Sequence, residues 1–298
     1  TAVLLATCIA NPPAAAQTSY KVYFLGGQSN MDGYGYVEEL PPELNAPVPG
    51  VRIFHGNHAA DDSIGGGLGI WSELRPGHGA GFSSDGVANF YSERFGVEQT
   101  LALRLLELDP GANIAFVKYS RGGTTIDAEG AGRAGSWDPY YDGGEGVNQY
   151  DHFLATVRNA MSAGDIDGDG APDQFEPAGI IWMQGESDGA RTPQVARRYL
   201  SNLTRLMGLI RAAFRVDDIP VVIGRISDSG QGESGKVWSY GDMVRAAQAA
   251  FVEFDGAAAL VTSTDGYSYS DPWHYDSAGY IDLGRQFADA VVGLARER

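Results

Sequence analysis

The sequence has 298 residues, 43% of them hydrophobic, and a formal net charge of −17 at pH 7. This length and this apolar fraction are sufficient for a sizeable core in one large α/β domain or two small ones. The acidic balance argues against nucleic acid and against anionic membrane surfaces as partners.

The first 18 residues resemble the end of a secretory signal peptide. Residues 2–10 form an apolar run too short to span a bilayer, and the small residues 14–16 suit a cleavage site. Cys8 is the only cysteine, which excludes an intramolecular disulfide, and its neighbours faintly resemble a lipoprotein box. We expect residues 1–18 to be a signal remnant or disordered leader of a secreted or periplasmic protein. Lipid anchoring through Cys8 is the weaker alternative.

From residue 19 onward, short β-rich runs alternate with helical patterns, which is typical of a parallel sheet covered by helices on both faces. No repeat or linker interrupts the pattern, so we expect one domain over 19–298. Thr192 and Pro193 suit the start of a helix. The sequence predicts strands at 20–25, 51–54, 113–119, 179–183, 219–225 and 257–262, and helices at 97–108, 150–163, 193–214, 239–254 and 277–295.

The first predicted strand, 20–25, leads directly into residues 26–31, which read Gly-Gly-Gln-Ser-Asn-Met. A serine just beyond a strand, next to glycines that let backbone amides turn toward it, is a natural position for a nucleophile. Ser29 lacks the Gly-x-Ser-x-Gly pattern of an α/β-hydrolase elbow. The alternative interpretation is a Gly-rich turn capped by Ser29.

Three further polar clusters lie just beyond predicted strands, at 120–125, 184–188 and 271–274. Ligands of open parallel sheets bind at the edge where the strands end, so we expect the clusters to meet there. Long Gly-rich segments at 56–86 and 127–149 contain several aromatic residues. They favour the walls of a binding cleft or, with equal weight, packing over the scaffold.

The clusters contain the parts of an acyl-transfer site. His274 is the one histidine in a compact motif with a nearby carboxylate, Asp271, which can orient the imidazole while His274 activates Ser29. Donors for a tetrahedral oxyanion are also available. We expect them to be the Ser29 amide, the amide of Gly122 or Gly123, and the side-chain amide of Gln184.

Together, the motifs Gly-Gln-Ser-Asn-Met, Arg-Gly-Gly-Thr, Gln-Gly-Glu-Ser-Asp and Asp-x-x-His resemble the SGNH hydrolase superfamily over about residues 20 to 296. More narrowly, they resemble its branch of sialate O-acetylesterases and family 6 acetyl xylan esterases. The resemblance implies a flavodoxin-like three-layer α/β/α sandwich and deacetylation of acetylated oligo- or polysaccharides without a catalytic metal. It assigns the nucleophile to Ser29, the base to His274 and the acidic partner to Asp271.

Two positions complicate the resemblance. Met183 stands where many relatives have a histidine, which removes a secondary contact but no member of the triad. Glu186 matches a glutamate that some relatives use as the acidic partner. The sequence leaves Asp271 and Glu186 as alternatives for that role.

Residues 165–176 match a calcium-binding loop of the EF-hand type. Gly170 occupies the sixth position, where the chain must turn sharply, and Pro177 prevents a following helix. The alternative is a solvated acidic turn, but closely packed carboxylates repel one another unless a cation lies among them. We expect structural calcium, with ligands from Asp165, Asp167, Asp169, Ala171, Asp173 and Glu176.

Two other functions compete with sugar deacetylation. An SGNH esterase could act on lipids or thioesters, although the aromatic Gly-rich loops and the lack of an apolar lid count against this. A non-catalytic carbohydrate-binding protein would not need Ser29, Asp271 and His274 together. The oligomeric state is not indicated.

Overall fold

The computed structural model describes residues 17–60, 63–144 and 146–296. Its centre is a seven-stranded sheet in the order β11-β10-β9-β1-β8-β3-β4, in which only β4 runs antiparallel to its neighbour. The strands are β1 (Ser19–Gly27), β3 (Arg52–His55), β4 (Trp71–Glu73), β8 (Asn113–Ser120), β9 (Gln174–Met183), β10 (Val221–Gly224) and β11 (Ala258–Val261).

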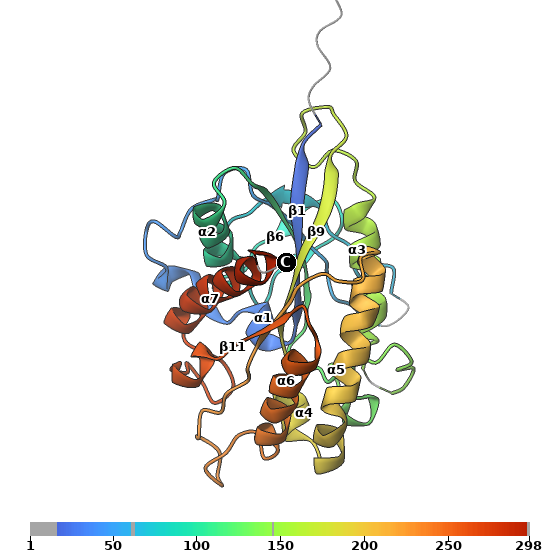
Figure 1. Cartoon of the computed structure of the whole chain (residues 1–298), viewed down its shortest axis with the longest axis vertical. Coiled ribbons are helices and arrows are strands. Elements are labelled where there is room, and N and C mark those ends of the chain that lie inside the picture. The colour runs from blue at the N-terminus through green and yellow to red at the C-terminus, as the bar shows by residue number, and fades with distance from the viewer. Residues whose placement is uncertain (1–16, 61–62, 145, 297–298) are drawn as a thin grey trace, which may run out of the picture.

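Helices cover both faces of this sheet (Figure 1). On one side, α2 (Glu98–Leu108) packs against α7 (Ser277–Arg296). On the other lie α3 (Gln149–Met161), α5 (Pro193–Phe214) and α6 (Gly241–Phe254), with α5 in contact with both of the others. The expected three-layer α/β/α sandwich is therefore confirmed.

Helix α5 shows why these segments are helical. Thr192 caps it by accepting the Val195 backbone N–H at 3.2 Å, and Pro193 occupies the first turn. Its buried residues recur at a spacing of three or four, which turns one apolar stripe toward the sheet. They are Val195, Ala196, Tyr199, Leu203, Leu206, Met207, Ile210 and Phe214.

Short elements complete the described chain. Two of them, α1 (Ser29–Asp32) and α4 (Glu186–Ala190), follow β1 and β9 directly. The others are β2 (Gly35–Tyr36), β5 (Ser83–Ser84), β6 (Asn89–Phe90), β7 (Arg94–Phe95) and the 3-10 turns η1 (Val37–Glu39), η2 (Ala128–Gly130) and η3 (Ser263–Gly266).

The central strands end at one level. Gly27 of β1 pairs with Met183 of β9 and with Ser120 of β8, so the polar clusters that follow these strands meet at one edge. The core order β8-β1-β9-β10-β11 is that of a flavodoxin-like sheet, whose ligands bind where the connections diverge, here between β1 and β9. Gly27 has a φ of 143°, and a Cβ there would lie 2.0 Å from the Met183 oxygen, so only glycine fits.

All six expected strands and all five expected helices are present, with ends shifted by a few residues. The largest change is in β9, which starts five residues earlier than expected, at Gln174. Strand β4, the antiparallel edge strand, was not expected from the sequence. The leader assignment, including Cys8, lies largely outside the described residues.

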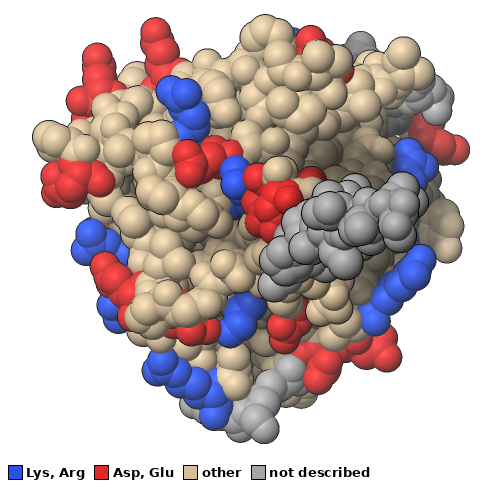
Figure 2. Space-filling model, turned by 90° about the horizontal axis from the view of Figure 1, so that it is seen from above, with Lys and Arg blue, Asp and Glu red and all other residues tan. Residues whose placement is uncertain are grey.

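On the face shown in Figure 2, Lys and Arg side chains are interspersed with acidic side chains. Within the described ranges, no helix is both long and apolar enough to cross a membrane.

Candidate active site

A cavity of about 490 Å³ lies where β1 and β8 end. Ser29, Gly122, Gly123 and His274 all line it, so the structure brings together four of the residues expected from sequence. Its remaining wall includes Gln28, Asp32, Tyr34, His55, Gly56, His58, Gly79, Ala80, Gly81, Phe82, Arg121, Ser187, Ala190, Arg191, Trp238 and Trp273.

Ser29 is the first residue of α1 and is 6% exposed. The first backbone N–H groups of a helix have no partner inside the helix, which leaves the Ser29 amide available to a ligand. Gly122 lies against Ser29, because a Cβ at position 122 would be 3.2 Å from the Ser29 Cβ. Any side chain at this position would therefore be in tight contact with Ser29.

His274 and Asp271 form a hydrogen-bonded pair. The His274 Nδ1 lies 2.7 Å from the Asp271 Oδ2, while Oδ1 accepts the backbone N–H groups of Trp273 and His274. Burial alone would raise the pKa of Asp271, but these hydrogen bonds outweigh burial and lower it. An ionised carboxylate can only accept, so Nδ1 carries the imidazole proton and Nε2 is left to act as a base.

Tyr34 supports the imidazole from one face. Its ring stacks on that of His274 with a centroid separation of 3.6 Å and an angle of 4° between planes. The Arg94 guanidinium lies over the Tyr34 ring and donates to the Tyr34 backbone oxygen at 2.5 Å. No motif pointed to Tyr34, because its role depends on a ring about 240 residues away in the chain.

Glu186 does not contact the His274 ring. Its Oε1 accepts from the Asn30 Nδ2 at 2.7 Å, and its Oε2 has no partner among the described residues. Burial raises the pKa of this carboxyl group. The same Asn30 Nδ2 donates to the Trp273 oxygen, so Asn30 links Glu186 to the loop that carries His274.

The expectation that Gln184 supplies an oxyanion donor is not supported by the structure. Its side chain is fully buried outside the cavity, with Nε2 donating to the Asp188 Oδ2 at 2.7 Å and the Thr124 oxygen at 3.1 Å. Tyr199 donates to its Oε1. Burial raises the pKa of Asp188 to about 7. Gln184 therefore braces the strand ends.

Of the two glycine amides considered, that of Gly122 is already used. It donates to the Asp32 Oδ2 at 2.8 Å, and the other Asp32 oxygen accepts from Ser120. The neighbouring Gly123 amide has no hydrogen-bond partner in the described part of the chain. Asp32 was missed by sequence reasoning, although it lies on the same helical turn as Ser29.

Two arginines, Arg121 and Arg191, line the cavity, and neither forms a salt bridge within the described ranges. The Arg121 Nη1 is buried without a hydrogen-bond partner there. Burial lowers the pKa of both His55 and His58, which favours their neutral forms. Positive charge at the cavity therefore comes from arginine.

The two Gly-rich segments have different roles. Segment 56–86 contributes His58 and Phe82 to the cavity wall, as expected for a cleft. Segment 127–149 contributes none of the lining residues, and its Trp137 is fully buried in the core. The cleft interpretation fits the first segment, and the packing interpretation fits the second.

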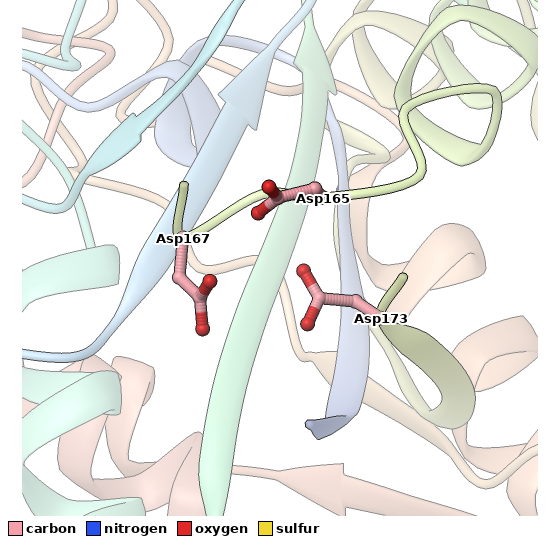
Figure 3. Close-up of side chains that lie close together, drawn as sticks. All are labelled: Asp165, Asp167 and Asp173. Atoms are coloured by element: carbon pink, nitrogen blue, oxygen red, sulfur yellow. The ribbon is translucent and has the colours of Figure 1, made fainter. Parts of the chain in front are cut away.

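The acidic loop lies at the other end of β9 from the cavity. Carboxylate oxygens of Asp165, Asp167 and Asp173 lie within 4.8 Å of one another (Figure 3). The other two expected carboxylates are not part of this group. Asp169 accepts the backbone N–H of Ala171, and Glu176 lies within β9, where the chain has already entered the sheet.

Comparisons with known proteins agree with this geometry. Residues 19–293 match the family described as carbohydrate esterase, sialic acid-specific acetylesterase. No curated protein matches the sequence. A structure from Arabidopsis thaliana is 19% identical, with a TM-score of 0.64 over 93% of this chain and 99% of that chain.

Two further structures were also found. A carbohydrate acetylesterase from Xanthomonas citri is 17% identical, with a TM-score of 0.60 over 93% of this chain and 57% of that chain. The protein NanS is 18% identical, with a TM-score of 0.60 over 95% of this chain and 100% of that chain. At such identities the likeness establishes the fold.

Proposed function

The chain belongs to the carbohydrate esterase family of sialic acid-specific acetylesterases, and we propose that it deacetylates sugars with Ser29 as nucleophile, His274 as base and Asp271 as its partner. The observation that carries these roles is the hydrogen-bonded pair of His274 and Asp271 in the cavity that contains Ser29. Membership in the family makes the chain a carboxylic ester hydrolase without a catalytic cofactor.

The reaction proceeds in two halves. The His274 Nε2 takes the Ser29 hydroxyl proton as Oγ attacks the acetyl carbon, and the carbonyl electron pair moves onto oxygen. When that pair returns, the bond to the sugar oxygen breaks and this oxygen takes the proton from His274. Water, deprotonated by His274, then attacks the acetyl group on Ser29, and acetate leaves as Oγ regains a proton.

The negative oxygen of each tetrahedral intermediate needs donors that are in place beforehand. We assign this role to the backbone amides of Ser29 and Gly123. The first begins α1, and the second has no other partner in the described part of the chain. Asp32 contributes indirectly, because its bond to the Gly122 amide fixes the turn that presents Gly123.

We further propose that the substrate is an acidic sugar of the sialic-acid type. Arg121 and Arg191 both line the cavity and have no salt bridge to a carboxylate within the described ranges, so a carboxylate on the substrate would find a partner there. Acetylated xylan is neutral along its backbone and offers no such partner.

The test is acetate release from O-acetylated sialic acid and from acetylated xylan at equal acetyl concentration. The wild type should favour the acidic sugar, and Arg121→Gln should lose that preference by roughly 10-fold or more. Arg121→Gln should hydrolyse 4-nitrophenyl acetate at close to the wild-type rate. Equal kcat/KM on both sugars contradicts the acidic-sugar proposal. A preference for long acyl chains, or sugar binding without any hydrolysis, would favour the two competing functions.

We also propose that Asp165, Asp167 and Asp173 hold a structural calcium ion. Gly170, at the turn position of the loop, has a φ of 86°, as that turn requires. The Asp173 Oδ1 is buried without a hydrogen-bond partner within the described ranges. Burial and the neighbouring aspartates raise the pKa of Asp173, because both disfavour its ionised form. A cation at this position would offset both effects.

Finally, we propose that the protein is exported, on the basis of the signal-like composition of residues 1–18. Fractionation of the native host checks this, and a protein confined to the cytoplasm contradicts it.

A further inference from the structure

Trp273 combines exposure with a fixed position beside the catalytic base. It lies between Asp271 and His274, lines the cavity and is 50% exposed. Other large apolar side chains are also exposed, but among the described residues Trp273 alone of these belongs to the cavity wall. Single exposed hydrophobic side chains are common, whereas one at the mouth of an active site calls for an explanation.

The backbone around this indole is held from several directions. The Trp273 N–H donates to the Asp271 Oδ1 at 2.7 Å, and its oxygen accepts from the Asn30 Nδ2 at 3.2 Å. The oxygen of Pro272, the residue before it, accepts from the Ser229 hydroxyl at 2.9 Å. A ligand that covers the indole would therefore spend little free energy on ordering the backbone that carries it.

The chemistry determines which part of the substrate lies here. His274 must return its proton to the leaving sugar oxygen, so the sugar has to sit on the side of Ser29 that His274 occupies. Trp273 precedes His274 in the chain, and their ring centroids are 6.3 Å apart. An acetyl group held at Ser29 is too small to cover an indole, whereas a pyranose ring presents a flat face of C–H groups.

We propose that Trp273 is the platform on which the sugar ring stacks, and that this subsite orients the leaving group toward His274. The inference rests on the proposed function, since it names the part of the same site that holds the sugar. It predicts that Trp273 discriminates between leaving groups and not between acyl groups. Stacking on this ring, which does not react, contributes to binding of the sugar ester in the ground state and the transition state alike, so its loss should appear mainly in KM.

The experiment compares Trp273→Ala and Trp273→Phe with wild type on an O-acetylated sugar and on ethyl acetate, whose leaving group is too small to stack. Trp273→Ala should lower kcat/KM for the sugar about 10-fold, mostly through KM, and leave ethyl acetate within about two-fold. Trp273→Phe should recover part of the loss. Phe254→Ala is the matched control, because Phe254 is 80% exposed and does not line the cavity.

Several outcomes would overturn the inference. Unchanged sugar kinetics in Trp273→Ala excludes a platform, and equal losses on both substrates indicate a structural role. A loss confined to esters with longer acyl chains, such as ethyl butyrate, places the indole on the acyl side. A wild type that hydrolyses ethyl acetate but no acetylated sugar overturns the proposed function itself. If Trp273→Ala does not fold, a wild-type-like KM for the sugar in Trp273→Phe and in Trp273→Leu also overturns the platform.

Discussion

Strand β9 connects two clusters of polar side chains that the chain builds in different ways. At its start, one short loop brings Asp165, Asp167 and Asp173 together. At its end, residues from β1, β8, β9 and the last loop meet, and Asn30 hydrogen-bonds to Trp273 across 243 residues of sequence. The geometry of the loop is determined by its own backbone, whereas the geometry of the cavity depends on the register of the sheet.

This difference suggests that the two clusters have different roles, one in catalysis and one in stability. The cavity holds the residues proposed for catalysis, Ser29 and His274, next to buried polar side chains in fixed positions. The loop lies on the opposite edge of the sheet and contains none of the proposed catalytic residues. Changes at the cavity should therefore reduce the rate first, and changes at the loop should reduce stability first.

The largest effect should come from Ser29→Ala, which removes the nucleophile. We expect kcat for 4-nitrophenyl acetate to fall roughly 10⁴-fold or more. The melting temperature should move by no more than about 2 °C, because one hydroxyl is lost and the backbone is unchanged. Ser201→Ala on the exposed face of α5 is the control. Substantial residual activity in Ser29→Ala would contradict the assigned mechanism.

Asp271→Asn should have the next largest effect, because an amide can hold the imidazole in the wrong tautomer. We expect a loss in kcat of roughly 10²- to 10⁴-fold. Glu186→Gln should cost less than about 10-fold, since its link to the loop of the base runs through Asn30. Steady-state kinetics on both variants provides the ranking. The reverse ranking would move the role of acidic partner to Glu186.

Asp188 allows the stability of the region beside the cavity to be measured separately from catalysis. The pKa of this buried carboxyl is about 7 in the folded protein, against an ordinary value near 3.9 in the unfolded chain. Between these values the folded state binds more protons than the unfolded state. Its contribution to the free energy of unfolding therefore falls as the pH rises, by at most about 1.4 kcal/mol per pH unit.

Urea unfolding of wild type and Asp188→Asn from pH 4 to 8 measures this contribution as a difference between the two proteins. The wild type should lose stability relative to the variant between about pH 4 and pH 7. The difference should be flat outside that window. A constant difference throughout would show that Asp188 is ionised in the folded protein across this range.

The smallest effect should be that of chelation at the acidic loop. Removing an ion that binds only the folded state lowers stability by mass action, so we expect EGTA to lower the melting temperature by about 2–6 °C. Excess calcium should restore it, and kcat/KM should change little. Asp165→Asn should abolish the response, whereas Asp169→Asn should retain it. A melting temperature that EGTA does not change contradicts the calcium proposal. A loss of activity without unfolding contradicts the separation of catalysis from stability.

The helices and central strands could be predicted from the sequence, because apolar periodicity is a property of each segment alone. The runs that became β1 and β8 are continuous and buried, and α5 carries its cap and its apolar stripe within one segment. Strand β4 was missed because it is short, antiparallel and only partly buried, so its pattern is weak. Ser29 and His274 could be identified because each lies in a compact motif.

Residue roles that depend on distant partners could not be predicted. Gln184 has the right chemistry for an oxyanion donor, but its side-chain amide already donates to Asp188 and to the Thr124 oxygen. Similarly, Asp32 occupies the Gly122 amide. In the acidic loop, spacing alone suggested five carboxylates, but the path of the chain brings only three of them together.

The bonds of Asn30 also have a consequence for the order of folding. Its Oδ1 accepts from the Tyr280 hydroxyl at 2.7 Å across 250 residues, so the residue beside the nucleophile is tied to α7. Contacts between such distant positions form late, because the intervening chain must first become compact. During synthesis on the ribosome, Ser29 emerges long before His274. A nascent chain can therefore build most of its sheet before Ser29 and His274 meet, and on the proposed mechanism it stays inert toward esters until the final helix docks.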